Sequence, residues 1–146
     1  MAKYEYKFSK NELAKVKEMI GNKEKIIFYF MGYADRNFII AKEEMITKNC
    51  CSCTVSHAFY WGADHFKFFQ YFSGLDSVLP QKIRIGLNFI KNIVDSDEFK
   101  IKLSTVYLTG FSLGGHIAGM IGHELKKIYN GKMVAAVWGN LNIEFR

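Results

Sequence analysis

The sequence predicts an α/β protein: a small, mostly parallel sheet layered with helices on both of its faces. Two observations lead to this class. Short apolar runs typical of buried strands alternate with longer segments in which apolar residues recur every three or four positions, as on one face of a helix. Strands separated by a helix pair in parallel, and their right-handed crossovers place the helices over the sheet.

Four segments have the composition of buried strands, with β-branched and aromatic residues predominating. They cover residues 26–31, 53–60, 103–109 and 133–138. The last of them is expected to be buried on both faces. An extra N-terminal strand is expected over residues 4–8, where Tyr4, Tyr6 and Phe8 alternate with charged residues.

Four further segments have helical spacing. The first follows Ser9, which forms a capping box with Glu12, and it ends at Gly21. The others cover residues 38–48, 80–94 and 112–129. Pro80 is expected in the first turn of its helix. Residues 62–74, which include the aromatic run HFKFFQYF, are expected to form a loop.

Length and composition indicate one domain over residues 1–146. With 49% hydrophobic residues the chain can bury a core, which excludes a disordered segment. The longest apolar run, residues 26–31, is far shorter than a membrane-spanning helix, so no transmembrane segment is expected. The net charge of +6 is spread along the chain without a basic cluster, and we expect no nucleic-acid partner.

The cysteines bear on compartment and metal binding. Cys50, Cys51 and Cys53 lie too close together for ordinary disulfides, and no distant cysteine exists. A zinc site would need a fourth ligand, and His57 is poorly placed on the same strand, so no metal is expected. The first ten residues lack the apolar stretch of a secretory signal. Reduced thiols and an intracellular location are therefore predicted.

One motif carries chemistry. Gly110-Phe-Ser112-Leu-Gly114 is a G-x-S-x-G placed between a predicted strand and a predicted helix, the context of a nucleophile elbow. The serine hydroxyl of such an elbow projects at the carboxyl end of the sheet, near the positive end of the following helix. Glycines two residues to either side keep side chains clear of the neighbouring backbone.

The run from Val106 to Gly119, VYLTGFSLGGHIAG, resembles the elbow of the pancreatic-lipase-like family of α/β hydrolases. That family includes neutral lipases, insect phospholipases A1 and insect yolk proteins. Its run is G-[HF]-S-L-G-A-H-x-A-G, and this chain departs from it at Gly115. Weaker likenesses lie at residues 28–33 (FYFMGY), 60–62 (YWG) and 71–93, so the resemblance covers roughly residues 24–142.

The resemblance implies a truncated α/β-hydrolase fold, with four of the usual eight strands in the order 2-1-3-4 counted from Ile26. It places Ser112 at the nucleophile position and assigns the oxyanion hole to the backbone N–H groups of Leu113 and Tyr33. No cofactor is implied. Because members of this family are secreted, the resemblance leaves open that this chain is secreted as well.

The partners of the serine depart from the family. Its acid is the Asp of a G-L-D-P segment, onto which Trp138-Gly-Asn140-Leu falls, so a neutral amide occupies the acid position. The chain ends at Arg146, before the position of the family's histidine. His65, with Asp64 or Asp76 nearby, is the best substitute base. A histidine from a partner chain is the other route.

The remaining histidines have structural interpretations. His116 is expected to pack against the sheet, His123 to be exposed, and His57 to lie within a strand. Because its last predicted strand would form an apolar edge, the chain is expected to self-associate, most simply as a two-fold homodimer.

Three functions stay open on the sequence. The leading hypothesis is a lipase-like pseudoenzyme with a binding, storage or structural role, whose cleft for a lipid or acyl ligand is lined by Tyr33, Phe111 and residues 66–72. The alternative is a serine esterase or lipase acting through Ser112 with a rewired or partner-supplied histidine. The third is a self-assembling protein in which the fold alone matters.

Overall fold

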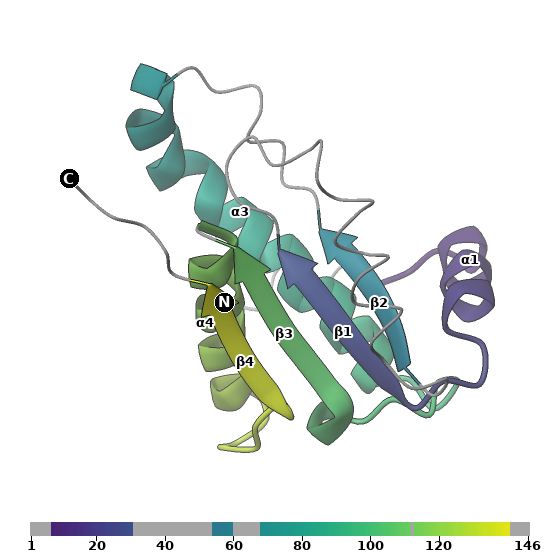
Figure 1. The fold of residues 1–146 in the computed structure, drawn as a ribbon. Coiled ribbons are helices and arrows are strands. Elements are labelled where there is room, and N and C mark those ends of the chain that lie inside the picture. The colour runs from purple at the N-terminus through teal and green to yellow at the C-terminus, as the bar shows by residue number, and fades with distance from the viewer. Residues whose placement is uncertain (1–6, 31–53, 60–67, 112, 141–146) are drawn as a thin grey trace.

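Four parallel strands form the sheet of the computed structural model (Figure 1). The structure describes residues 7–30, 54–59, 68–111 and 113–140, and gives only the backbone for residues 54–59, 68–79, 82, 111 and 140. The strands are β1 (Lys25–Phe30), β2 (Thr54–Phe59), β3 (Val106–Phe111) and β4 (Ala136–Asn140). Their order is β2-β1-β3-β4, which confirms the expected order.

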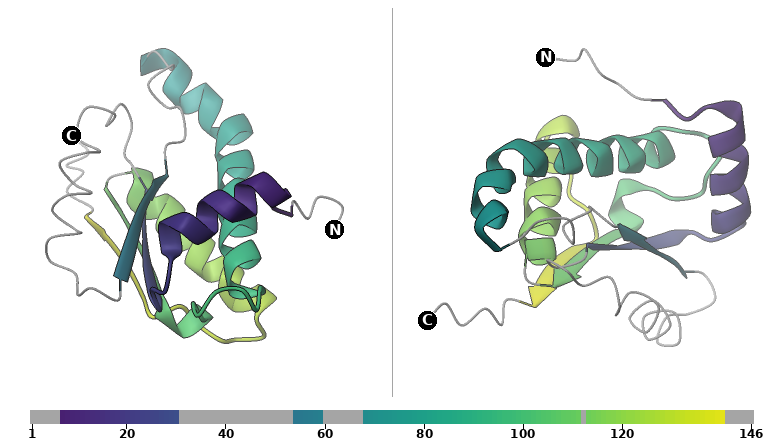
Figure 2. Two further views of the ribbon diagram at one scale, coloured as in Figure 1. Left: turned by 90° about the vertical axis from the view of Figure 1, so that its right-hand side faces the viewer. Right: turned by 90° about the horizontal axis from the view of Figure 1, so that it is seen from above.

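The sheet is α/β in type because every neighbouring pair is parallel. β1 pairs with β2 and with β3, and β3 pairs with β4. Parallel strands need long crossover connections, and two of these contain helices. Helix α3 (Phe68–Val94) connects β2 to β3, on the other side of β1, and α4 (Leu113–Ile128) connects β3 to its neighbour β4. Both lie on the same face of the sheet (Figure 2). The helix expected over residues 38–48 lies outside the described residues.

The central strand β1 supplies the middle of the core. All five residues from Ile26 to Phe30 are buried, since β1 has a strand on each side and α3 and α4 cover one of its faces. The helical side of the core is built from fully buried isoleucines and leucines, namely Ile90, Ile93, Ile117, Ile121 and Leu125. Close packing of these aliphatic side chains between the helices and the sheet fixes the positions of α3 and α4.

Helix α1 (Lys10–Ile20) begins and ends as predicted. The Glu12 N–H donates to Ser9 Oγ at 3.2 Å, and the Ser9 N–H donates to Glu12 Oε2 at 2.8 Å, so the capping box is formed. The helix ends at Gly21, whose φ of 55° suits a residue without a Cβ. Val16 and Ile20 are buried against the core.

Two elements begin later than predicted. Residues Leu103–Thr105 form a 3₁₀ turn instead of the start of a strand, because Thr105 Oγ1 both accepts from the Lys102 N–H and donates to the Lys102 carbonyl. β3 therefore runs from Val106 to Phe111, two residues beyond the expected end. β4 is likewise shifted, to Ala136–Asn140.

Helix α3 is longer than predicted. Residues 68–74, expected to belong to an aromatic loop, are its first turns, and Pro80 lies inside it rather than in its first turn. In the aromatic run of residues 65–72, apolar residues are too closely spaced for the three-to-four-residue spacing of a helix to be recognised. A proline within a helix removes one backbone hydrogen bond and bends the axis, and the ribbon of α3 changes direction along its course (Figure 2).

The expectation that the last strand is buried on both faces is wrong. Val137 and Trp138 are 43% and 47% exposed. β4 is the last strand in the described sheet, so no further strand of the described residues covers its outer edge. The N-terminal strand expected over residues 4–8 is not seen at Lys7 and Phe8, which have no regular secondary structure, and residues 4–6 lie outside the description.

Candidate functional site

The junction between β3 and α4 is the candidate site. β3 ends at Phe111 and α4 begins at Leu113, so a single residue separates a strand from a helix. That residue, Ser112, lies outside the described residues. A direct change from strand to helix across one residue requires a sharp turn, as an elbow does. The motif predicted a strand-to-helix turn at this point, although the predicted strand ended two residues earlier, at Thr109.

The two glycines of the motif hold this junction together. A Cβ on Gly110 would lie 2.2 Å from both the carbonyl carbon and the carbonyl oxygen of Gly114, and 2.6 Å from the backbone nitrogen of Gly115. Real Cβ atoms do not approach backbone so closely, so position 110 tolerates only glycine without a backbone shift. The first turn of α4 thus packs directly on the backbone of β3.

A second close approach joins α4 to β4. A Cβ on Gly139 would lie 3.0 Å from the Cα of Gly115. Sequence reasoning gave Gly139 no such role, although a glycine within a strand often marks close backbone approach. The first turn of α4 therefore lies over β3 and β4 together, with backbone against backbone at Gly110, Gly114, Gly115 and Gly139.

Asn140 lies at the carboxyl end of the neighbouring strand. It is the last residue of β4 and is paired in register with Phe111, the residue that precedes Ser112. The carboxyl ends of adjacent parallel strands meet at one edge of a sheet, where α/β proteins place their sites. The position that the resemblance assigns to the acid thus lies beside the carboxyl end of β3.

Of the two residues assigned to the oxyanion hole, only Leu113 lies within the described part of the chain. Leu113 is the first residue of α4 and is buried. The first four N–H groups of a helix have no partner within the helix and carry partial positive charge. The other assigned donor, Tyr33, lies outside the described residues.

The histidines do not complete a catalytic set within the description. His116 and His123 are both exposed on α4. The expectation that His116 packs against the sheet is wrong, because Leu113, Ile117 and Ala118 fill the inward faces of that part of the helix. The expectation for His123 is confirmed.

The other histidines are placed less fully. The backbone of His57 lies within β2, opposite Phe28. His65, the substitute base, lies outside the described residues, as do Asp64 and the three cysteines. The backbone of Asp76 lies within α3.

The described residues contain neither a metal-binding cluster nor a membrane-spanning helix. In that part of the chain, no group of three His, Cys, Asp or Glu side chains is placed to hold a metal ion. None of the described helices combines the length and apolarity that crossing a membrane requires.

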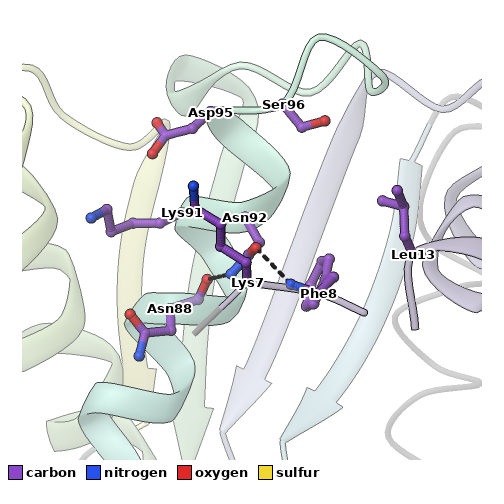
Figure 3. Close-up of a pocket in the computed structure, with 8 residues that line it drawn as sticks. All are labelled: Lys7, Phe8, Leu13, Asn88, Lys91, Asn92, Asp95 and Ser96. Atoms are coloured by element: carbon purple, nitrogen blue, oxygen red, sulfur yellow. Dashed lines mark hydrogen bonds between the residues drawn. The ribbon is translucent and has the colours of Figure 1, made fainter. Parts of the chain in front are cut away.

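A separate hollow of about 390 Å³ lies between the N-terminal segment and α3 (Figure 3). At its centre Asn92 accepts from the Phe8 N–H at 3.1 Å and donates through Nδ2 to the Asn88 carbonyl at 2.7 Å. The Phe8 ring meets the edge of Phe89, with centroids 5.1 Å apart. These contacts attach the entry of α1 to α3, which is a structural role.

The far end of α4 carries the strongest electrostatic perturbation among the described groups. The Tyr129 hydroxyl donates to Asp95 Oδ1 at 2.6 Å, joining the end of α4 to the end of α3. Burial and the neighbouring Asp95 carboxylate raise the pKa of Tyr129 well above its ordinary value. The two residues lie far from the β3–α4 junction along the helix, so this bond secures α4 and takes no part in the candidate site.

Comparisons with protein-family models, with curated proteins and with solved structures give no match. The likeness to the lipase family therefore rests on the residues quoted above.

Proposed function

We propose that this chain is a lipase-like protein of α/β-hydrolase type that keeps the nucleophile elbow and has lost most of its hydrolytic power, serving to bind an acyl or lipid ligand. The observation that carries the proposal is the place of Asn140. Its backbone pairs with Phe111 at the carboxyl end of the sheet, and the resemblance assigns the acid to this position, which holds a neutral amide.

The elbow supports the first half of the proposal. A strand that passes into a helix across one residue, with glycine backbones in contact at Gly110 and Gly114, has the construction that exposes a serine above a sheet. In an acyl-transfer enzyme, preorganised N–H donors at this helix start would be worth several kcal/mol to the transition state.

The amide supports the second half. A serine hydroxyl needs a base, and the base needs an orienting carboxylate. An asparagine can accept a hydrogen bond from an imidazole but cannot stabilise imidazolium by charge. In a serine protease this single change lowers kcat about 10⁴-fold.

The start of α4 retains an attraction for a ligand. The unpaired N–H groups expected at the first turn of a helix, together with the helix dipole, favour the carboxylate or carbonyl oxygen of an acyl group. Binding can therefore persist without turnover.

Hydrolysis of a short-chain p-nitrophenyl ester tests the loss of catalysis. We expect no turnover that Ser112→Ala abolishes, and no labelling of Ser112 by a fluorophosphonate. Ser104→Ala, at an exposed serine in the 3₁₀ turn, is the matched control. Asn140→Asp completes the design: if a histidine already reaches Ser112, restoring the carboxylate raises the rate by up to about 10⁴. Such a rise would mean that the amide at position 140 limits catalysis, as proposed, whereas wild-type turnover that is lost only in Ser112→Ala contradicts the proposal and establishes the esterase.

Ligand binding is tested with a fluorescent fatty-acid analogue. We expect saturable binding that Ser112→Glu weakens at least about tenfold, because a carboxylate at the helix start repels that of the ligand. Ser104→Glu adds the same charge elsewhere and should leave the affinity unchanged. Equal affinities for both variants would place the ligand away from the elbow.

A further inference from the structure

Within the described residues, the outer edge of β4 shows none of the features that protect an edge strand. Proteins usually guard such edges with lysine, proline or a covering segment. Residues 133–140 contain no charged residue and no proline. Met133 is 64% exposed, and Val137 and Trp138 are about half exposed. This apolar edge is the feature to be explained.

We propose that β4 pairs with β4 of a second copy of this chain, in an antiparallel two-fold dimer centred on Trp138 that continues the sheet. The two-fold axis stands perpendicular to the sheet, so both copies keep α4 on the same face. The proposal is independent of the elbow's chemistry.

The register follows from the strand itself. β4 has five residues with Trp138 at the centre, so pairing there matches the full length of both strands. Val137 then lies opposite the partner's Gly139, which has no side chain and leaves it room. A shift of one residue would turn the two copies' side chains to opposite faces, and a shift of two would leave edge groups unpaired.

The position of α4 suits the same arrangement. The Gly114 and Gly115 backbones pack on Gly110 of β3 and Gly139 of β4, which places the helix axis between the two strands. Neighbouring strands are about 4.8 Å apart, so the two α4 axes would lie about two spacings, or ~10 Å, from each other. Packed helices are separated by 8–10 Å. A sheet continued across the two-fold thus brings two helices to contact distance.

Gly119 would lie where these helices meet. It falls on the outer flank of α4, between Gly115 and Gly122, which lie over Gly139 and Val137, so it is level with Trp138. It is exposed, and among the described residues no atom lies within 4 Å of a Cβ placed on it. The flank is therefore open to receive the helix of the second copy.

Charge and area both favour the antiparallel pair. The exposed Lys126 and Lys132 lie near the start of β4, and the two-fold places those of the two copies at opposite ends of the interface. The two helix dipoles oppose each other. A stable dimer needs about 800 Å² per partner, and the exposed part of Trp138 gives only ~100 Å². The strand edge and the helix flank are thus needed together, and one two-fold supplies both.

Sedimentation across a dilution series tests the association. We expect a dimer in the wild-type chain. Trp138→Lys and Gly119→Lys each place like charges at the two-fold axis and should weaken the dimer at least about tenfold. The matched control is Ile85→Lys, because Ile85 is 53% exposed and lies on α3 rather than on β4 or α4. Far-UV circular dichroism verifies folding, and Gly119→Lys points into open space in the single chain. A monomeric wild type, or equal weakening by Ile85→Lys, overturns the proposal.

Cysteine crosslinking tests the register. In a background with Cys50, Cys51 and Cys53 replaced by serine, Trp138→Cys brings two thiols together at the axis, where paired Cα atoms lie about 4.5–5.5 Å apart. Val137→Cys is the control, because its counterpart would lie about 8 Å away, beyond disulfide reach. We expect a covalent dimer from the first variant alone. Crosslinking of Val137→Cys alone overturns the register.

Discussion

The two sides of α4 differ in how their glycines are used. On the inner side, Gly110 of β3 allows the helix backbone to lie directly on the strand, and a Cβ there would overlap Gly114. On the outer flank, Gly119 faces open space. The same residue type is thus a steric requirement at one position and, within a single chain, a cost in helix stability at the other.

A side chain at Gly110 would disrupt the packing of α4 on β3, whereas a side chain at Gly119 would be accommodated at the surface. The inner side has no freedom left, since strand and helix backbones already touch. The outer flank can change without disturbing the chain. We therefore expect substitutions across this boundary to differ in sign as well as in size.

The largest effect is expected for Gly110→Ala. Its methyl group would meet the Gly114 carbonyl at 2.2 Å, so the first turn of α4 must move off β3. We expect a loss of at least about 3 kcal/mol in the free energy of unfolding, measured by urea denaturation. A loss below about 1 kcal/mol would show that the backbone at the β3–α4 junction adjusts easily to a side chain. Gly110 would then not differ from Gly119 in its steric requirement.

Gly139→Ala is an intermediate case between Gly110, where an added Cβ would overlap backbone atoms, and Gly119, where it would meet none. The added Cβ would lie 3.0 Å from the Cα of Gly115, so a shift of a few tenths of an ångström relieves the contact. We expect a loss of about 1–2 kcal/mol by the same measurement. An effect as large as that of Gly110→Ala would mean that β4 cannot adjust, although it lies at the sheet edge.

Tyr129→Phe tests the other end of α4. Removing the hydroxyl that donates to Asp95 should cost about 1 kcal/mol at neutral pH. The raised pKa of Tyr129 means that the unfolded chain ionises first, so its stabilising contribution is complete below about pH 10 and declines above it. The stability difference between wild type and Tyr129→Phe, followed by denaturant titration at increasing pH, should shrink above that value. A difference that grows with pH would mean that the hydroxyl is not the donor.

The smallest effect is expected for Gly119→Ala. Alanine is the better helix former and meets no atom at this position, so a stabilisation of about 0.5–1 kcal/mol is expected. Thermal or urea unfolding at low protein concentration measures it in the single chain. Destabilisation would show that the flank is already covered within one chain.

Much of the fold could be predicted from local patterns. The capping box at Ser9 and Glu12 and the stop at Gly21 define α1 because the signals lie within a few residues of each other. The apolar run beginning at Ile26 indicates a central strand, and its burial confirms this. The α/β class follows from the alternation of strands and helices.

Elements whose limits depend on distant contacts could not be predicted so well. The Thr105 side chain diverts three residues into a turn, and the proline inside α3 is tolerated against its usual preference. Burial of β4 was overestimated because a run of apolar residues does not show which strand lies at the edge.

In the candidate site, too, the features that are local in sequence could be predicted and the contacts between different elements could not. The motif predicted that Gly110 and Gly114 keep side chains clear of the neighbouring backbone, because the elbow is local in sequence, and the close approach at Gly110 agrees with this. The contact of Gly139 with Gly115 and the bond from Tyr129 to Asp95 join residues on different elements, and no spacing rule reveals them. Asn140 could be placed only through the family resemblance.

The strand order also sets a sequence of events during synthesis. β1 is made early, but its partner β3 lies 80 residues further along the chain, since Ile26 pairs with Val106. At ribosomal rates of 5–20 residues per second, β1 waits about 4–16 s for that partner. Throughout this interval five consecutive apolar residues, Ile26 to Phe30, have one unpaired side, the kind of segment that aggregates. The yield of native protein should therefore depend on how quickly translation reaches β3.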